Sequence, residues 1–100
     1  MPNHEIRITE AAYDDLLSIV EYIANDNSIA APQLTDEIEQ RIEALKEFPE
    51  MGIIPKLPRL ARGYRILIVN DYLVFYVKLD EVIEIRRIVS GKRDYTKLLQ

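Results

Sequence analysis

The second half of the chain alternates apolar and polar positions in a way that predicts β-structure. Three runs rich in β-branched and aromatic residues span positions 64–69, 72–78 and 82–89. Asn70-Asp71 separates the first two runs, and Leu79-Asp80-Glu81 separates the last two. Short connections of this kind are typical of β-hairpins, so we expect an antiparallel three-stranded meander.

The last of these runs is expected to place apolar side chains on one face and charged side chains on the other. Because side chains alternate along a strand, we expect Ile83, Ile85 and Val89 on one face, with Glu84 and Arg86 on the other. The run then leads into the sequence Ser-Gly-Lys-Arg-Asp-Tyr. The sheet is therefore predicted to present a basic cluster at the end of its last strand.

The first half of the chain has helical periodicity instead. After a short strand predicted at residues 4–8, Thr9 is placed to cap a helix that runs to about Asn25. Its apolar stripe comprises Tyr13, Leu16, Leu17, Val20 and Ile23. A second helix is predicted after the candidate cap Ser28; it ends at Phe48-Pro49 and has the stripe Leu34, Ile38, Ile42 and Leu45. The two helices are expected to form an antiparallel hairpin.

Together these elements predict an α+β fold. The expected order is an N-terminal strand, the antiparallel two-helix hairpin and the three-stranded antiparallel meander, with the first strand adding to the meander edge to form one twisted sheet. Residues 49–63 contain three prolines and two glycines, so we expect an ordered surface loop without regular structure. One hundred residues are the size of one domain, which we expect to span residues 1–100.

Composition narrows the class of protein. The chain has no cysteine, which excludes disulfides and thiolate metal sites and agrees with a cytoplasmic location. No apolar run is long enough to cross a membrane, and no signal pattern opens the sequence. The single histidine, His4, and the spacing of the carboxylates match no zinc or calcium motif, so neither a metal nor another cofactor is expected.

Charge is divided unevenly along the chain. Residues 1–50 contain twelve acidic and three basic residues, whereas residues 51–100 contain five acidic and ten basic ones. The net charge of −4 therefore conceals a basic half, which suits an anionic partner if it forms one face. The alternative is that the acidic helices solvate one side and the basic strands balance them.

The basic half supplies the candidate site. Two tyrosines, Tyr72 and Tyr95, accompany a set of cations that comprises Arg62, Arg65, Arg86, Arg87, Lys92 and Arg93. Arginine presents a fixed fork of donors to phosphate oxygens, and a tyrosine ring stacks on bases. On neighbouring strands these residues are expected to line one groove. The alternative is that the arginines pair with Glu84, Asp94 and the acidic helices.

The order and spacing of several segments resemble a known family. These segments are ITEAAYDDLLSIVEYIA, IEALKEFPEMG, the arginine in GYRILIV, the strand DYLVFYV, and IEIRRIVSGKRDY at the end. Through them the chain resembles, over essentially its whole length, the RelE/ParE superfamily of toxins from bacterial type II toxin-antitoxin modules. The resemblance implies the same α+β fold and a toxin that arrests growth of its bacterial host.

The RelE branch of this superfamily cleaves messenger RNA in the ribosomal A site with basic residues and a tyrosine. If the chain were such a ribonuclease, the resemblance and the nearby tyrosines would make the catalytic candidates Arg65, Arg93, Tyr72 and Tyr95. However, Leu67, Tyr72 and Leu99 stand where that branch has a lysine, an arginine and the C-terminal tyrosine. An endoribonuclease would therefore need a rearranged site.

The ParE branch inhibits DNA gyrase. Its second helix ends in the pattern Leu-x-x-x-Pro-x-x-Gly, which this chain matches at residues 45–52. The incomplete ribonuclease set and the acidic net charge, which opposes binding to ribosomal RNA, favour gyrase inhibition over RNA cleavage. A third interpretation is a non-toxic module whose only activity is to hold an antitoxin or another peptide in a groove.

The resemblance also implies a heteromeric complex with a cognate antitoxin protein. We expect an acidic or amphipathic segment of that antitoxin to cover Arg65, Arg87 and Arg93. The expected target is DNA gyrase, or alternatively the ribosome with its message, and no membrane is involved. Because Arg93 is expected at a loop end, Arg93→Ala should reduce toxicity with little loss of stability.

Overall fold

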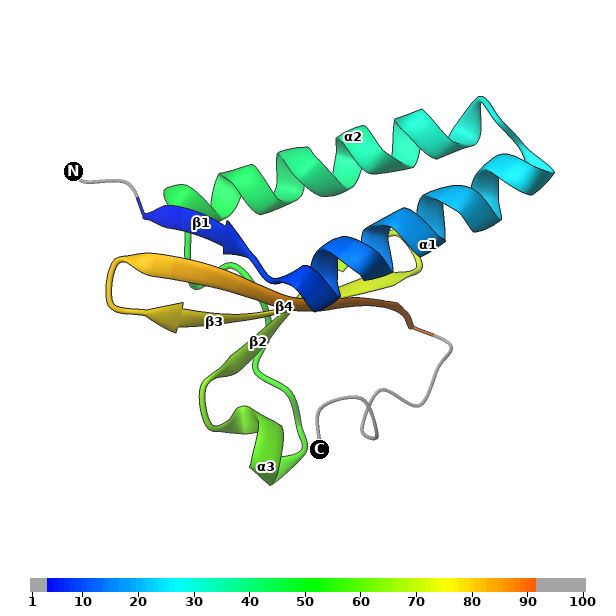
Figure 1. Ribbon diagram of the computed structural model, residues 1–100. Helices are drawn as coiled ribbons and strands as arrows, with labels where there is room; N and C mark the ends of the chain where they lie inside the picture. Colours follow the sequence, from blue (N-terminus) through cyan, green and yellow to red (C-terminus); the bar gives the residue numbers. More distant parts are fainter. Residues whose placement is uncertain (1–3, 92–100) are drawn as a thin grey trace.

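The computed structural model describes residues 4–91, which form one sheet and a helical hairpin packed on it (Figure 1). In chain order the elements are β1 (Glu5–Ile8), α1 (Glu10–Asp26), α2 (Ala30–Glu43), the 3-10 turn η1 (Ala44–Lys46), α3 (Pro58–Ala61), β2 (Tyr64–Val69), β3 (Tyr72–Leu79) and β4 (Val82–Ser90). All the predicted strands and both predicted helices are present. The α+β architecture is therefore confirmed.

The four strands lie in the order β1-β4-β3-β2. Strands β2, β3 and β4 form the predicted antiparallel meander, and β1 adds to its edge beside β4. β1 runs parallel to β4, with Ile6 opposite Ile83 and Ile8 opposite Ile85. The sheet is therefore mixed rather than fully antiparallel, because a long connection that includes two helices permits parallel pairing.

Both hairpin turns of the meander contain a residue in the left-handed region. The φ angle is 54° at Asn70 and 57° at Asp80. Asn and Asp adopt such angles more readily than most other residues, and two-residue hairpin turns require them. The predicted turn positions are confirmed, and β3 extends one residue further than expected, to Leu79.

A bulge interrupts the pairing of β3 with β4. Phe75 lies opposite Arg87, but the next residue, Tyr76, lies opposite Ile85. Arg86 is therefore the extra residue on β4. One extra residue inverts the alternation of side chains for the rest of the strand.

The bulge corrects one prediction about the faces of β4. Ile88 joins Ile83 and Ile85 in the core beneath the helices. Val89 instead packs on the opposite face, in a second cluster with Phe75. The expectation that Val89 shares a face with Ile83 and Ile85 is therefore wrong, because simple alternation does not anticipate the extra residue.

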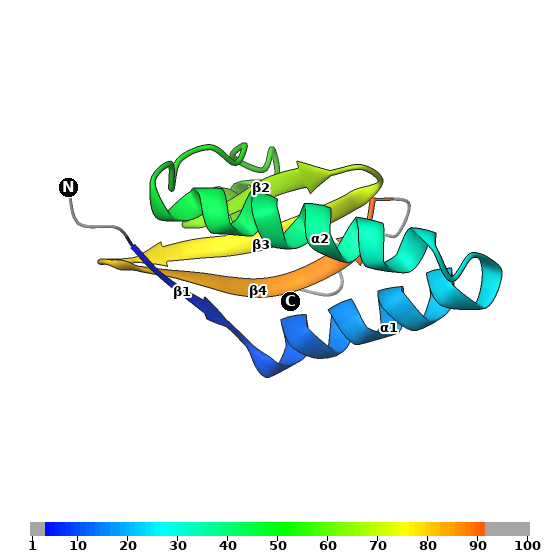
Figure 2. The same ribbon diagram turned by 90° about the horizontal axis from the view of Figure 1, so that it is seen from above.

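The helical hairpin covers one face of the sheet, as Figure 2 shows from above. The core between the two layers is apolar and contains Ala12, Ile38, Ile42, Leu45, Leu67, Val69, Val74, Tyr76, Ile83, Ile85 and Ile88. Full burial of one large aliphatic side chain stabilises the fold by roughly 2 kcal/mol relative to exposure. This layer therefore fixes how α1 and α2 sit on the strands.

The face of α1 that meets the sheet differs slightly from the predicted stripe. Ala12 is fully buried, and Leu16 and Ile19 pack against the core. Tyr13 and Leu17, which belong to the predicted stripe, are about half exposed. Periodicity counted from large residues overlooks Ala12, whose small side chain lets the helix approach the sheet.

Thr9 caps α1 as predicted. Its side-chain oxygen accepts a hydrogen bond from the Ala12 N–H at 3.1 Å. The same hydroxyl donates to the Arg86 carbonyl at 3.1 Å, which ties the start of the helix to β4. One side chain thus completes both the helix end and the strand beside it.

The start of α2 corrects the prediction of a Ser28 cap. The side-chain oxygen of Asn27 accepts hydrogen bonds from the N–H groups of Ile29 and Ala30, at 3.1 and 3.2 Å. Asn side chains readily bond to backbone groups two or three residues ahead. Asn27 therefore supplies the acceptor expected from Ser28.

The segment before β2 is more regular than predicted. It contains α3, which begins at Pro58, and an isolated bridge between Ile53 and Ile66 of β2. Proline suits the first helical position because its φ is already helical and its missing N–H is not needed there. Leu60, at 1% exposure, anchors the turn. The expectation of no regular structure at residues 49–63 is therefore wrong.

Candidate functional site

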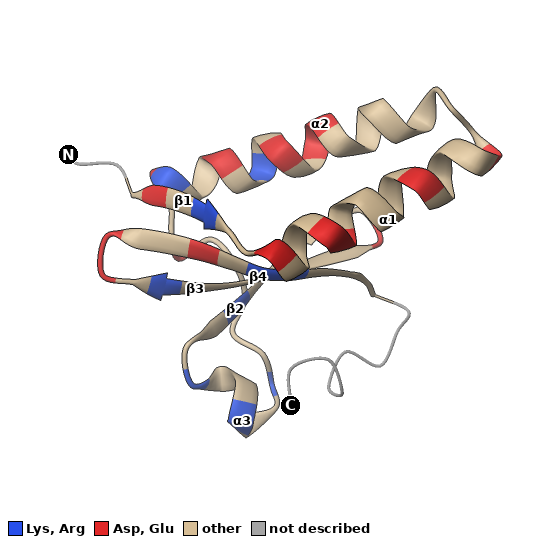
Figure 3. Ribbon diagram, viewed as in Figure 1, with Lys and Arg blue, Asp and Glu red and all other residues tan. Residues whose placement is uncertain are grey.

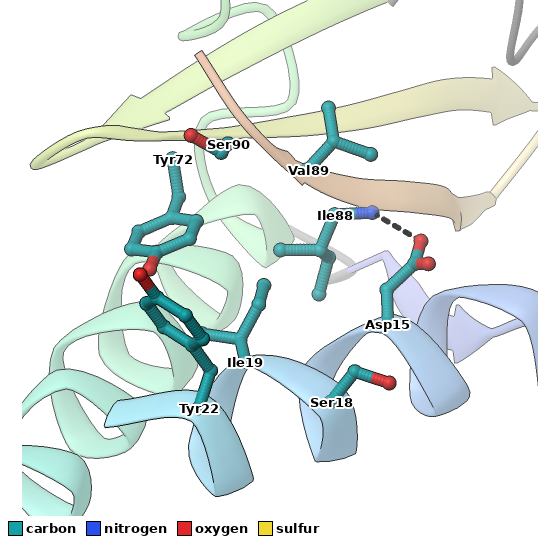
Figure 4. A pocket seen from close by; sticks show the side chains of 8 residues that line it. All are labelled: Asp15, Ser18, Ile19, Tyr22, Tyr72, Ile88, Val89 and Ser90. Carbon is teal, nitrogen blue, oxygen red and sulfur yellow. Dashed lines mark hydrogen bonds between the residues drawn. The ribbon is translucent and has the colours of Figure 1, made fainter. Parts of the chain in front are cut away.

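A groove lies between α1 and the paired ends of β3 and β4, and we call it the tyrosine groove (Figure 4). Its volume is about 430 Å³, and its lining comprises Asp15, Ser18, Ile19, Tyr22, Tyr72, Ile88, Val89 and Ser90. Within residues 4–91, Tyr72 is the one predicted site residue in this lining. The groove offers hydroxyl groups, apolar side chains and one carboxylate.

The short length of β1 creates this groove. β1 ends at Ile8, and the Thr9 N–H donates to the Ile85 carbonyl at 3.0 Å. Beyond Ile85, α1 rather than a strand lies along the edge of β4 (Figure 1). There the Ile88 N–H donates to the Asp15 carboxylate at 2.9 Å. An unpaired buried N–H is costly, so Asp15 completes the edge that β1 leaves open.

Asp15 also holds an arginine in a two-point contact. Arg87 donates from Nε and Nη2 to the two carboxylate oxygens, at 2.7 and 2.8 Å. The hydrogen bond to Asp15 raises the pKa of Arg87, although burial acts in the opposite direction. Such bidentate pairs are strong and geometrically specific. The pair therefore joins α1 to β4 next to the groove. Within the fold, the charge of Arg87 is balanced by the Asp15 carboxylate.

Two tyrosines from different layers meet in the groove. Tyr72 begins β3, and Tyr22 projects from α1 with 77% exposure. In Figure 4 their hydroxyl groups point towards each other. Burial raises the pKa of Tyr72, and the neighbouring Asp71 and Tyr22 raise it further. Tyr72 therefore stays neutral near pH 7 and offers a ring and a hydroxyl to a ligand rather than a base.

Arg65 lies in a separate place, where β2 meets the turn after η1. Its Nη1 donates to the carbonyls of Gly52 and Glu50, at 2.9 and 3.3 Å. Beside it, the buried Tyr76 hydroxyl donates to the Pro49 carbonyl and accepts from the Gly52 N–H, both at 2.8 Å. Burial raises the pKa of Tyr76, while the bond from Gly52 and the charge of Arg65 lower it. Arg65 and Tyr76 together hold this turn against the sheet.

Arg86 lies on the face of the sheet away from the helices. It forms an ion pair with Glu84, and its guanidinium lies 6.0 Å from the centre of the Tyr64 ring. Glu84 also lies 3.6 Å from Arg7 of β1. Arg86 is therefore engaged by neighbours on its own face, and it is not part of the tyrosine groove lining.

The arginines of the predicted set that the structure describes do not share one groove. Arg65 contacts the turn after η1, Arg87 contacts Asp15 of α1, and Arg86 pairs with Glu84 on the sheet face away from the helices. Arg62 is exposed directly after α3. The other three predicted site residues, Lys92, Arg93 and Tyr95, lie outside the described residues.

Sequence reasoning missed the residues that shape the groove. Asp15 belongs to the polar side of α1, where a carboxylate is expected to be solvated. Its role depends on the residue at which β1 ends and on the approach of Arg87 from β4. Tyr22 lies outside the apolar stripe and gave no signal of its own. Only the packing of α1 along β4 brings these side chains together.

Two other kinds of site are absent from the described part of the chain. Within residues 4–91 no group of three His, Cys, Asp or Glu side chains is placed to hold a metal ion. In the same range no helix is both long and apolar enough to cross a membrane.

Comparison with known proteins decides the family. The family model described as the ParE toxin of type II toxin-antitoxin system, parDE, matches residues 6–95. The chain belongs to the ParE toxin family. The match spans α1 to β4, and thus both layers of the fold. The resemblance to the RelE/ParE superfamily seen in the sequence is confirmed.

The fold of this ParE-family chain is also seen in a solved structure. A structure described as "Chromosomal ParDE TA system from P. aeruginosa" matches with a TM-score of 0.74 and 18% sequence identity. The match covers 87% of this chain and 95% of that chain. At this low identity the likeness concerns the fold. No curated protein sequence matches the chain significantly.

Proposed function

We propose that this ParE-family chain arrests bacterial growth in the cytoplasm by binding and inhibiting DNA gyrase, and that a cognate antitoxin neutralises it. Membership of the ParE toxin family supports a toxin role. The observation that carries the choice of mechanism is the placement of Arg65, whose guanidinium donates to two backbone carbonyls. An inhibitor that acts by surface contact does not need this group to be free.

The alternative of RNA cleavage requires groups that this geometry does not favour. A ribonuclease needs a cation aimed at the reacting phosphate and a group that moves a proton near neutral pH. Arg65 and Arg87 are held by the turn after η1 and by Asp15. The pKa of Tyr72 is raised, so an even smaller fraction of its hydroxyl is ionised at neutral pH than in a free tyrosine. These contacts favour inhibition by binding over catalysis.

The tyrosine groove suits the proposed antitoxin. It combines the apolar Ile19, Ile88 and Val89 with the hydroxyls of Tyr22 and Tyr72. A groove of mixed apolar and hydroxyl character accepts one face of an amphipathic helix or extended peptide. The P. aeruginosa structure is described as a ParDE system, which supports a partner of the same class here.

Two assays with the same purified chain test the choice of target. The first measures DNA supercoiling by gyrase, and the second maps cuts in ribosome-bound message by primer extension. We expect loss of supercoiling with intact message. Cuts at codon positions with unchanged supercoiling would overturn the proposal in favour of a ribonuclease.

Matched variants identify the surface responsible. Arg93→Ala is expected to weaken inhibition, as inferred from the sequence. Lys78→Ala changes an exposed cation on β3 and should inhibit like the parent chain. If neither activity is found with the folded chain, the toxin proposal fails and only a binding role remains.

A further inference from the structure

The segment before β2 presents a surface that the proposed function does not use. We call it the α3 platform, and it consists of Ile53, Ile54, Lys56, Leu57, Arg59 and Arg62. Figure 1 shows α3 on the side of the sheet away from α1 and α2. The platform is therefore separate from the tyrosine groove and from the helical hairpin.

Apolar side chains of the platform are exposed although its backbone is anchored. Ile53 and Ile54 are 55% and 56% exposed, and Leu57 is 37% exposed. At the same time Leu60 is buried, and Ile53 and Ile66 exchange hydrogen bonds of 2.9 and 2.8 Å. The backbone is thus fixed while three large aliphatic side chains face solvent, which is typical of an interaction surface.

The cations of the platform are not engaged by the described acids. Lys56, Arg59 and Arg62 are all exposed, and among residues 4–91 none of them forms an ion pair. The chain has no Asp or Glu at all from position 51 to position 70. Figure 3 shows Lys and Arg on α3 and its flanks, whereas acids follow α1 and α2. The platform therefore carries local positive charge on a chain of net charge −4.

This combination selects among anionic partners. A nucleic acid backbone would contact the cations but leave the three aliphatic side chains uncovered. None of the six platform residues is aromatic, so the platform lacks a ring on which a base could stack. An acidic protein segment that also carries aliphatic side chains satisfies both kinds of surface.

We propose that the α3 platform is a docking surface for a protein segment in which carboxylates alternate with aliphatic side chains. The cations attract the carboxylates, and the exposed side chains of Ile53, Ile54 and Leu57 receive the aliphatic groups. This docking does not depend on which protein the toxin inhibits. Gyrase activity does not enter the binding test, so its failure and failure of the proposed function are distinguishable.

The test uses a short synthetic peptide of alternating glutamate and valine, titrated into the full chain and followed by amide NMR shifts. Shifts are expected at residues 53–62. The double variant Lys56→Glu/Arg59→Glu should weaken binding at least about tenfold, which corresponds to ~1.4 kcal/mol. Leu57→Ser should also weaken it, whereas Lys78→Glu on β3 should bind like the parent chain. All of these positions are exposed, so the variants are expected to fold.

Several results would overturn the inference. If polyglutamate of equal charge bound as tightly as the alternating peptide, the aliphatic side chains of the platform would have no part in binding. A single-stranded oligothymidine of equal charge that binds the platform more tightly would make it a nucleic-acid surface. Self-association lost in the Lys56→Glu/Arg59→Glu variant would assign the platform to a second copy of the chain. Absence of peptide binding at about 1 mM, or shifts confined to α1 and β4, would also reject the proposal.

Discussion

Replacing Tyr76 with phenylalanine removes a single oxygen atom from the centre of the fold. The Tyr76 side chain is fully buried, and its hydroxyl makes two hydrogen bonds of 2.8 Å, to the Pro49 carbonyl and from the Gly52 N–H. In Tyr76→Phe both backbone groups lose their partner while the ring still fills its place. A buried polar group left unpaired costs about 1–3 kcal/mol, so we expect a loss of about 3 kcal/mol for the pair.

Urea unfolding monitored by circular dichroism measures this loss. The transition midpoint should fall without a change in the m-value, since the surface exposed on unfolding stays the same. In a thermal scan the melting temperature should fall by on the order of 15 °C for a domain of this size. Tyr13→Phe is the matched control, because Tyr13 is 54% exposed; its effect should be within about 0.5 kcal/mol. A loss below about 0.5 kcal/mol in Tyr76→Phe would refute the reasoning.

Gly52 provides an independent check of the same contact. A Cβ added at this residue would lie 2.6 Å from the Tyr76 oxygen and 2.7 Å from a carbon of its ring. Removing the oxygen leaves the ring contact in place. Gly52→Ala should therefore destabilise both the parent chain and the Tyr76→Phe variant; rescue of Gly52→Ala by Tyr76→Phe would contradict the close approach of the ring.

Three further predictions concern neighbouring contacts. Asp15→Asn removes the negative partner of a half-buried arginine and should cost about 2 kcal/mol in urea unfolding, whereas the exposed Asp14→Asn should stay within about 0.5 kcal/mol; equal effects would contradict the edge contact. Asn27→Ala should cost about 1 kcal/mol and Ser28→Ala almost nothing, and the reverse order would restore Ser28 as the cap. Burial raises the pKa of Tyr76 above its ordinary 10.0. The contribution of the Tyr76 hydroxyl to the free energy of unfolding is therefore complete below about pH 10 and is lost as pH rises through the folded-state pKa. The stability advantage over Tyr76→Phe should therefore shrink in alkaline unfolding scans and stay constant between pH 6 and 8; an advantage that grows above about pH 10 would contradict the raised pKa.

The strands and turns could be predicted because their signals are local. Each strand carries its own two-residue alternation of apolar and polar side chains. Asn70 and Asp80 mark the turns between the strands. The bulge at Arg86 could not be predicted, because the sequence IEIRRIV is compatible with regular pairing. The extra residue is recognised only from the pairing of β4 with β3. This one extra residue places Val89 on the face of the sheet opposite to the one expected.

The predicted site depended on contacts between distant segments, and sequence gave less information there. Residue types alone indicated a basic surface, but not that Arg87 would meet Asp15 across 72 positions of sequence. The same holds for Arg65, whose partners are backbone carbonyls that no side-chain pattern reveals. Tyr72 does line a groove, yet its neighbour Tyr22 reaches that groove only because α1 packs along β4.

Plasmid topology in growing bacteria tests the central claim most directly. Expression of the intact chain is induced without an antitoxin, and the linking-number distribution of a reporter plasmid is measured as growth slows. Inhibition of gyrase predicts growth arrest accompanied by loss of negative supercoils. Growth arrest with normal plasmid topology, or continued growth despite soluble folded chain, would contradict the account.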